Sequence, residues 1–190
     1  MTNSDEATRL SIFTTVLEHA RLAPVDDVPL EEIAARVDTS VDEVRRYGAS
    51  THEILHVAIA DMLTALADAH EIIVASDDSP IAAGVDAEVA ILSHVVEFAP
   101  VYRAESSRAL WRTLTQLLRE HLLGHLRADP SSIPLSSAND RDVQMLAAFN
   151  AAGTTAAMEV WLQNENSRDI EEAVGVIFAS TPQWWLTPGR

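Results

Sequence analysis

Residues 30–47 read LEEIAARVDTSVDEVRRY, and they carry the strongest local pattern in the chain. The spacing predicts two short helices joined by a tight turn at Asp38-Thr39. Such a turn favours a left-handed residue, and Asp tolerates that conformation better than most residues other than glycine. Small or apolar side chains stand where the two helices would touch: Ile33, Ala34, Val37, Val44 and Tyr47. This pattern is typical of a helix-turn-helix, whose second helix enters the major groove of DNA.

Helical signals continue on both sides of this stretch. Ser40-x-x-Glu43 and Ser50-x-x-Glu53 fit capping boxes, which mark helix starts. Alternating strand patterns separated by tight glycine turns are missing, so we expect an all-α protein of about nine helices. In the first helix, Leu10, Phe13, Leu17 and Ala20 share one face, with Ile12 and Val16 beside them. The expected helices cover about residues 5–21, 29–37, 40–47, 50–74, 86–99, 101–105, 106–127, 139–164 and 167–179.

The composition excludes several classes of protein. The 190 residues include 29 acidic and 13 basic side chains, all of the latter arginine, and the formal net charge is −16. The absence of cysteine excludes disulfide scaffolds, thiol nucleophiles and Cys-based zinc sites. No apolar run is long enough for a membrane span, and residues 1–6 do not begin a secretory signal. We therefore expect a cytoplasmic protein.

The order of these elements resembles the TetR-like (tetracycline-repressor-like) family of transcriptional regulators, with a degenerate helix-turn-helix. A long helix precedes the motif, and a linker helix and an all-helical region follow it. Further motifs are similar to the last two helices of many members: Ala148-Phe149-Asn150-Ala151-Ala152-Gly153, then Val160-Trp161-Leu162, then a helix led by Ser167. The resemblance implies a helix-turn-helix DNA-binding-like domain over residues 1–57 and a helical effector-binding and dimerisation domain over residues 58–190.

The resemblance also implies a function and candidate sites. A homodimer would bind operator DNA, and a small-molecule effector would modulate its DNA affinity; no cofactor is expected. The candidate DNA contacts are Ser40, Val41, Arg45, Arg46, Tyr47 and Thr51. The candidate effector pocket is His70, His94, Phe98, Tyr102, Trp111, Leu114 and Phe149, the last facing either the pocket or the partner subunit. The candidate dimer contacts are Ala148, Ala152, Ala156, Val174 and Ile177.

The chain departs from the family around the recognition helix. Arg45 stands where Tyr is usual, Gly48 where Phe is usual, and Thr51 where a phosphate-binding Lys is usual. Residues 1–57 hold five arginines against eleven acidic residues, a net formal charge of −6 that opposes binding to phosphate. Arg45 and Arg46 either contact DNA or pair with Asp38, Asp42 or Glu43. The alternative function is therefore a TetR-like dimer that has lost DNA binding and acts as a ligand- or protein-binding module.

Signals for catalysis or for a metal are weak. His52 and His56 stand four residues apart, as do His121 and His125, a spacing that lets two histidines share a metal. No third ligand is identifiable, so surface or capping histidines are the preferred interpretation and no metal is expected. The chain has no G-x-S-x-G elbow, Walker loop or dinucleotide fingerprint, so we do not expect an enzyme.

Overall fold

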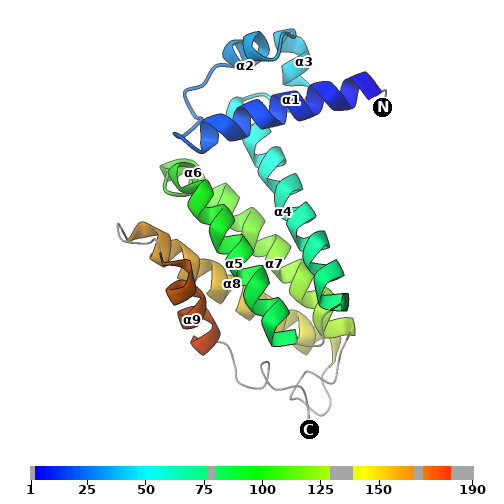
Figure 1. Cartoon of the computed structure of the whole chain (residues 1–190), viewed down its shortest axis with the longest axis vertical. Coiled ribbons are helices and arrows are strands. Elements are labelled where there is room, and N and C mark those ends of the chain that lie inside the picture. Colours follow the sequence, from blue (N-terminus) through cyan, green and yellow to red (C-terminus); the bar gives the residue numbers. More distant parts are fainter. Residues whose placement is uncertain (1–2, 77–79, 129–138, 165–168, 181–190) are drawn as a thin grey trace. The chain divides into compact units, whose positions relative to one another are not determined.

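The computed structural model describes residues 3–76, 80–128, 139–164 and 169–180, and these form α-helices and no strand (Figure 1). The predicted all-α class is therefore confirmed. The helices are α1 (Asn3–Ala20), α2 (Leu30–Arg36), α3 (Val41–Arg45), α4 (Thr51–Ser76), α5 (Pro80–Glu97), α6 (Ala99–Tyr102), α7 (Arg108–Ala128), α8 (Asp140–Gln163) and α9 (Ile170–Ser180), with a 3-10 turn, η1 (Glu105–Ser107). None of these described helices is long and apolar enough to cross a membrane.

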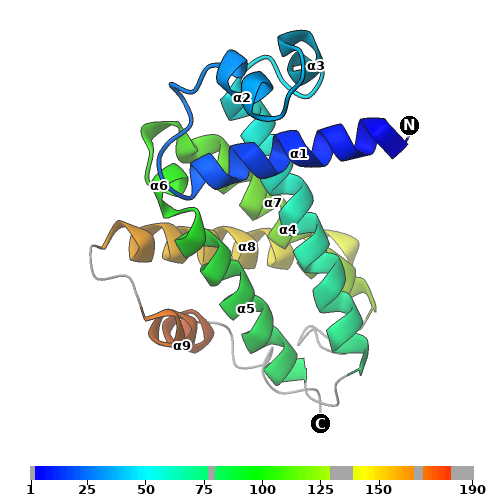
Figure 2. The same ribbon diagram turned by 45° about the horizontal axis from the view of Figure 1, so that its top comes forward.

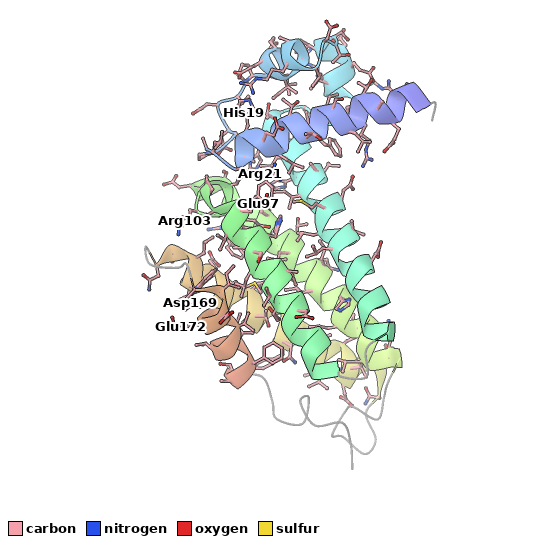
Figure 3. All side chains as sticks on the ribbon, in the orientation of Figure 1. His19, Arg21, Glu97, Arg103, Asp169 and Glu172 are labelled. Atoms are coloured by element: carbon pink, nitrogen blue, oxygen red, sulfur yellow. The ribbon has the colours of Figure 1, made fainter. Side chains whose placement is uncertain are left out.

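Most helix ends lie close to the predicted ones, with three differences. Helix α5 begins at Pro80 rather than near Asp86, because proline suits the first position of a helix. Pro29 precedes α2 in an extended conformation instead of starting it. Helix α9 begins after Asp169, whose carboxylate accepts a hydrogen bond from the Glu172 N–H at 3.0 Å (Figure 3); Ser167 lies outside the described residues.

The chain divides into two compact units. The N-terminal unit comprises Met1–Met62 and Glu97–Leu110, and the C-terminal unit comprises Leu63–Val96 and Trp111–Arg190. The N-terminal unit thus includes a segment from the middle of the chain, Glu97–Leu110. The predicted N-terminal domain, residues 1–57, does not include this segment. The assignment of DNA binding and effector binding to separate domains stays a prediction.

The core of the N-terminal unit is built around α1. Its buried side chains are Ile12, Phe13, Val16 and Ala20, whereas Leu10 is exposed. The buried face of α1 is therefore centred one residue away from the predicted one. The other helices contribute Ile33, Ala34, Val44, Ile54 and Leu55. Because these residues come from four consecutive helices, α1 fixes the motif that follows it.

The middle segment is tied to this unit by polar contacts. Arg21 Nε donates to a Glu97 carboxylate oxygen at 2.6 Å, and its guanidinium lies 5.1 Å from the centre of the Phe98 ring (Figure 3). Ser106 Oγ donates to Asp26 at 2.9 Å. These residues are far apart in sequence, so no local pattern predicts their contact.

The C-terminal unit holds α8 against α7. Leu126, Val143 and Ala147 form a buried cluster, and Leu122, Leu123 and Leu146 pack against it. The Thr115 and Thr155 hydroxyls lie 2.9 Å apart, and Arg127 pairs with Asp140 at 2.8 Å. Asn139 caps α8 in a complete capping box with Asp142. These contacts leave the opposite side of α8 to solvent.

One carboxyl group of the C-terminal unit is turned inward. Glu88 lies on the same face of α5 as the buried Leu92 and Val95. Its Oε2 atom is shielded from solvent and has no hydrogen-bond partner among the described residues. Burial raises the pKa of Glu88 from its ordinary 4.5 to about 7. The folded protein therefore holds this proton over a pH range in which the unfolded chain releases it.

We predict that Gly48→Ala destabilises the protein. An added Cβ would lie 2.9 Å from both the backbone nitrogen and Cγ1 of Ile54. That nitrogen is held at the start of α4 by its bond to the Ser50 carbonyl. We expect the free energy of unfolding in urea to fall by about 1–3 kcal/mol. Gly124→Ala, in an open position of α7, should raise it by up to about 1 kcal/mol. Equal effects of the two substitutions would contradict the crowding at Gly48.

We also predict a stability profile that depends on Glu88. Because its pKa is higher in the folded state, this group stabilises the fold at low pH, and the stabilisation is lost as pH rises from about 4.5 through about 7. Between pH 5 and 8 the loss should be roughly 2–3 kcal/mol. Urea denaturation of Glu88→Gln should show this slope removed, and the exposed Glu171→Gln should keep it. Parallel profiles for wild type and Glu88→Gln would refute the prediction.

Candidate functional site

The turn between α2 and α3 has the geometry that the sequence predicts. Asp38 has a φ of 52°, the left-handed conformation expected at this position. The reversal lets the Thr39 N–H donate to the Ala34 carbonyl at 3.0 Å. Helices α2 and α3 pack together through Ile33, Ala34 and Val44, all buried, and both lie on one side of α1 (Figure 2). The segment is therefore a helix-turn-helix in structure.

Capping of α3 leaves its acidic side chains free to pair with arginines. Ser40 Oγ accepts a hydrogen bond from the Glu43 N–H at 3.1 Å, so the first half of the predicted capping box is confirmed. The Glu43 carboxylate accepts from Arg46 instead of from Ser40 N. At α4, Ser50 Oγ accepts from the Glu53 N–H, and the Glu53 carboxylate accepts from Ala49 N. Both serines are thus engaged as helix caps.

Arg45 and Arg46 each pair with a carboxylate three residues earlier in the chain. Arg45 Nη1 lies 3.2 Å from Asp42, and Arg46 Nη1 lies 2.9 Å from Glu43. The hydrogen bond that Arg46 donates to the Glu43 carboxylate raises the pKa of Arg46, and the Asp42 side chain is 92% exposed. Exposed pairs of this kind contribute little to stability, so phosphate can compete for the arginines. In the structure both arginines thus pair with acidic residues, which is one of the two predicted alternatives, and both guanidinium groups stay at the surface.

Two other predicted DNA contacts are used for packing. Tyr47 meets Phe13 edge to face, with ring centroids 5.9 Å apart. Thr51 is only 2% exposed, and its hydroxyl donates to the Val28 carbonyl at 2.7 Å. Its position at the start of α4 turns the hydroxyl inward. Thr51 therefore serves packing in this structure, and its contact with DNA stays a prediction; Val41 is half-buried on α3.

The histidine pairs do not assemble a metal site. The His52 and His56 rings are 4.4 Å apart, and His52 Nδ1 lies 3.1 Å from Asp26. Within the described part of the chain, no three His, Asp or Glu side chains gather as metal ligands. The side chain of His125 lies outside the described residues. The His52–Asp26 pair instead joins α4 to the loop before α2.

The predicted pocket residues do not all belong to one unit. His94, Trp111 and Leu114 are buried in the C-terminal unit. Phe98 and Tyr102 are buried in the N-terminal unit, where burial raises the pKa of Tyr102 and keeps its hydroxyl protonated. The side chain of His70 lies outside the described residues. The composition of the effector pocket stays a prediction.

Phe149 lies on an apolar surface and not in the interior. Its side chain is 74% exposed, which favours the predicted alternative that it faces a partner subunit over the alternative that it lines the pocket. It belongs to an exposed stripe along α8 whose members recur every three or four residues: Met145, Phe149, Ala152, Ala156 and Val160. The spacing of these apolar residues in the sequence predicts the stripe. That the stripe is exposed becomes clear only from the structure, in which the opposite face of α8 is buried.

Some of the predicted dimer contacts are exposed in the single chain, and others are buried. Ala152 and Ala156 lie on the exposed stripe, and Ala148 is half-buried beside it. Val174 and Ile177 are buried within the single chain, where α9 packs on α8. Their side chains contribute to the core of their own unit, and their contact with a partner stays a prediction. Val176, which was not predicted, is exposed on α9.

Comparison with known proteins agrees with this architecture. No protein-family model and no curated protein matches the chain. Among solved structures, it is similar to a TetR-family transcriptional regulator from Pectobacterium atrosepticum, at 13% sequence identity and a TM-score of 0.65. The match covers 99% of this chain and 100% of that chain. The protein therefore has the fold of a TetR-family regulator, as its sequence resemblance predicts.

Proposed function

We propose that this protein is a homodimeric transcriptional regulator that binds operator DNA through α3 and changes its DNA affinity when a small molecule binds. The observation that carries the proposal is the helix-turn-helix with its left-handed Asp38, within a fold matched over nearly the whole chain. This geometry presents the outer surface of α3, and such surfaces meet base edges in the major groove.

Contacts to DNA would come from a small set of residues. Arg45 and Arg46 are the exposed cations of α3, and Ser40 and Val41 stand at its start. To reach guanine edges or phosphates, each arginine must exchange its pairing with Asp42 or Glu43. Binding would therefore be weaker and more dependent on salt than for a helix without acidic neighbours.

Dimerisation would use the exposed stripe of α8. Large apolar side chains are costly to leave in water, and Met145, Phe149 and Val160 are all well exposed. The small Ala152 and Ala156 between them allow another helix to approach closely. A two-fold pairing of this surface with its copy would bury the stripe. A ligand in the helical interior would then change the spacing of the two recognition helices by a population shift.

A second candidate function has its own support. Both cations of α3 are already paired with carboxylates of the same helix, and the Asp42 carboxylate projects into solvent. A dimer with this acidic surface could act as a ligand- or protein-binding module without contacting DNA. The two functions predict opposite results for variants that change the charges of Asp42, Glu43, Arg45 and Arg46. Neither function requires catalysis.

We predict that Arg45 and Arg46 provide the DNA affinity. Replacing both by Ala should weaken binding to the upstream region of the protein's own gene by about tenfold or more at low salt. Asp42→Asn with Glu43→Gln should strengthen binding, because the pairing and the repulsion are both removed. Log affinity should fall with log salt by about 0.9 per phosphate neutralised. Gel shifts with and without competitor DNA measure all three.

A matched control separates a local from a global effect of charge. Glu18→Gln with Asp27→Asn makes the same change in net charge at exposed sites outside α3. It should strengthen binding less than the α3 pair does. If neither wild type nor the α3 charge variant shifts any fragment, the regulator proposal fails and the non-DNA-binding module is the better account.

We also predict that the exposed stripe holds the dimer. Ala152→Arg places a charge in the middle of the stripe, where the side chain is exposed in the single subunit, so the subunit fold should survive. Light scattering at micromolar concentration should show wild-type dimers and Ala152→Arg monomers. Ala35→Arg, at an exposed alanine of α2, should remain dimeric. A monomeric wild type, or a dimeric Ala152→Arg, would remove the basis for this interface.

A further inference from the structure

Glu88 is a half-buried acid without a described structural role. The Oε2 atom is closed off from solvent and lacks a hydrogen-bond partner among the described residues. A buried polar atom without a partner is costly, and native proteins retain few of them. Such an atom within a helical unit indicates a missing donor, which a bound ligand can supply.

The surroundings of this carboxyl group favour a cation with an apolar body. Leu92 and Val95 share its face of α5, and Trp111 and Leu114 are buried in the same unit. Burial raises the pKa of Glu88 to about 7, so a cation close to this carboxyl group would stabilise its ionised form. The formal net charge of −16 attracts cations to the molecule and repels anions.

We propose that the C-terminal unit binds an organic cation, a protonated amine on an apolar skeleton, with the Glu88 carboxylate as its counter-ion and hydrogen-bond acceptor. The inference rests on the proposed function in one respect, since it names the chemical class of the effector. A charge-assisted hydrogen bond is short and strong where water is excluded, and Leu92 and Val95 on the same face of α5 would contact the apolar part of the molecule.

The same unit also contains a group that could recognise the opposite charge. Arg119 Nε on α7 is shielded and has no partner among the described residues. Arg119 shares a helix face with Thr115, which contacts Thr155 of α8, so it points toward the α7–α8 contact. A test of the proposal must therefore compare cationic and anionic probes directly.

Three probes with one skeleton provide that comparison: 4-phenylbutylamine, 4-phenylbutanol and 4-phenylbutyrate. Calorimetric titration of the full chain at pH 8 keeps the amine protonated and leaves Glu88 able to ionise. We expect the amine to bind about tenfold or more tightly than the alcohol, and the acid to bind most weakly. Glu88→Gln should reduce amine affinity to that of the alcohol and leave the alcohol unchanged. Glu171→Gln, an exposed change of the same kind in the same unit, should retain the wild-type order.

Each other result overturns the inference. Equal binding of amine and alcohol by wild type, stronger binding of the acid, or no binding of any probe contradicts a cation site. An amine preference that survives Glu88→Gln places the site elsewhere. The wild-type comparison stands even if Glu88→Gln folds poorly. Gel shifts on the same samples keep the two proposals apart: DNA binding without amine selectivity refutes only the cation site, and amine selectivity without DNA binding refutes only the regulator.

Discussion

The left-handed turn at Asp38 is the constraint on which the recognition surface depends. With φ at 52°, the chain reverses direction within two residues, and the Thr39 N–H reaches back to the Ala34 carbonyl. The reversal places Ser40 to cap α3 and turns Val44 into the core. Only then do Asp42, Arg45 and Arg46 share an outward surface. A residue that could not adopt this conformation would alter the direction of α3 and everything it presents.

Helix α8 has two apolar faces, one buried and one exposed. Its buried face, with Val143, Ala147 and Ala151, packs inside the C-terminal unit, and the opposite face carries the exposed stripe. Periodicity identifies both stripes as apolar but does not say which one the chain covers. That choice depends on α7, because the Thr115–Thr155 contact and the Leu126 cluster fix the rotation of α8. The exposure of Phe149 follows from this rotation of α8.

Features that depend on neighbouring residues could be predicted from the sequence, whereas contacts between distant residues could not. The helix class, the turn at Asp38 and the serine caps follow from residue types within four positions of one another. Thr51 was predicted to contact DNA because it stands where the resembled family usually has a phosphate-binding Lys. Its hydrogen bond to the Val28 carbonyl, 23 residues away, is not visible from the sequence. The assignment of the middle segment to the N-terminal unit depends on Arg21 meeting Glu97. Gly48 replaces the usual Phe of the family, and Ile54 leaves no room for a side chain there.

The strong negative charge has opposite consequences for the two kinds of partner. Carboxylates lie beside both Arg45 and Arg46, so DNA bound as proposed would have to displace an existing pair before it gained a contact. The proposed function would then have lower non-specific than specific affinity, because a bidentate base contact would compensate for the lost pair and a single phosphate contact would compensate less. In the C-terminal unit the same charge would favour the proposed cation near Glu88, where shielding from solvent weakens screening by salt. Under both proposals, the acidity of the molecule would weaken non-specific binding to polyanions and favour a small ligand of positive charge.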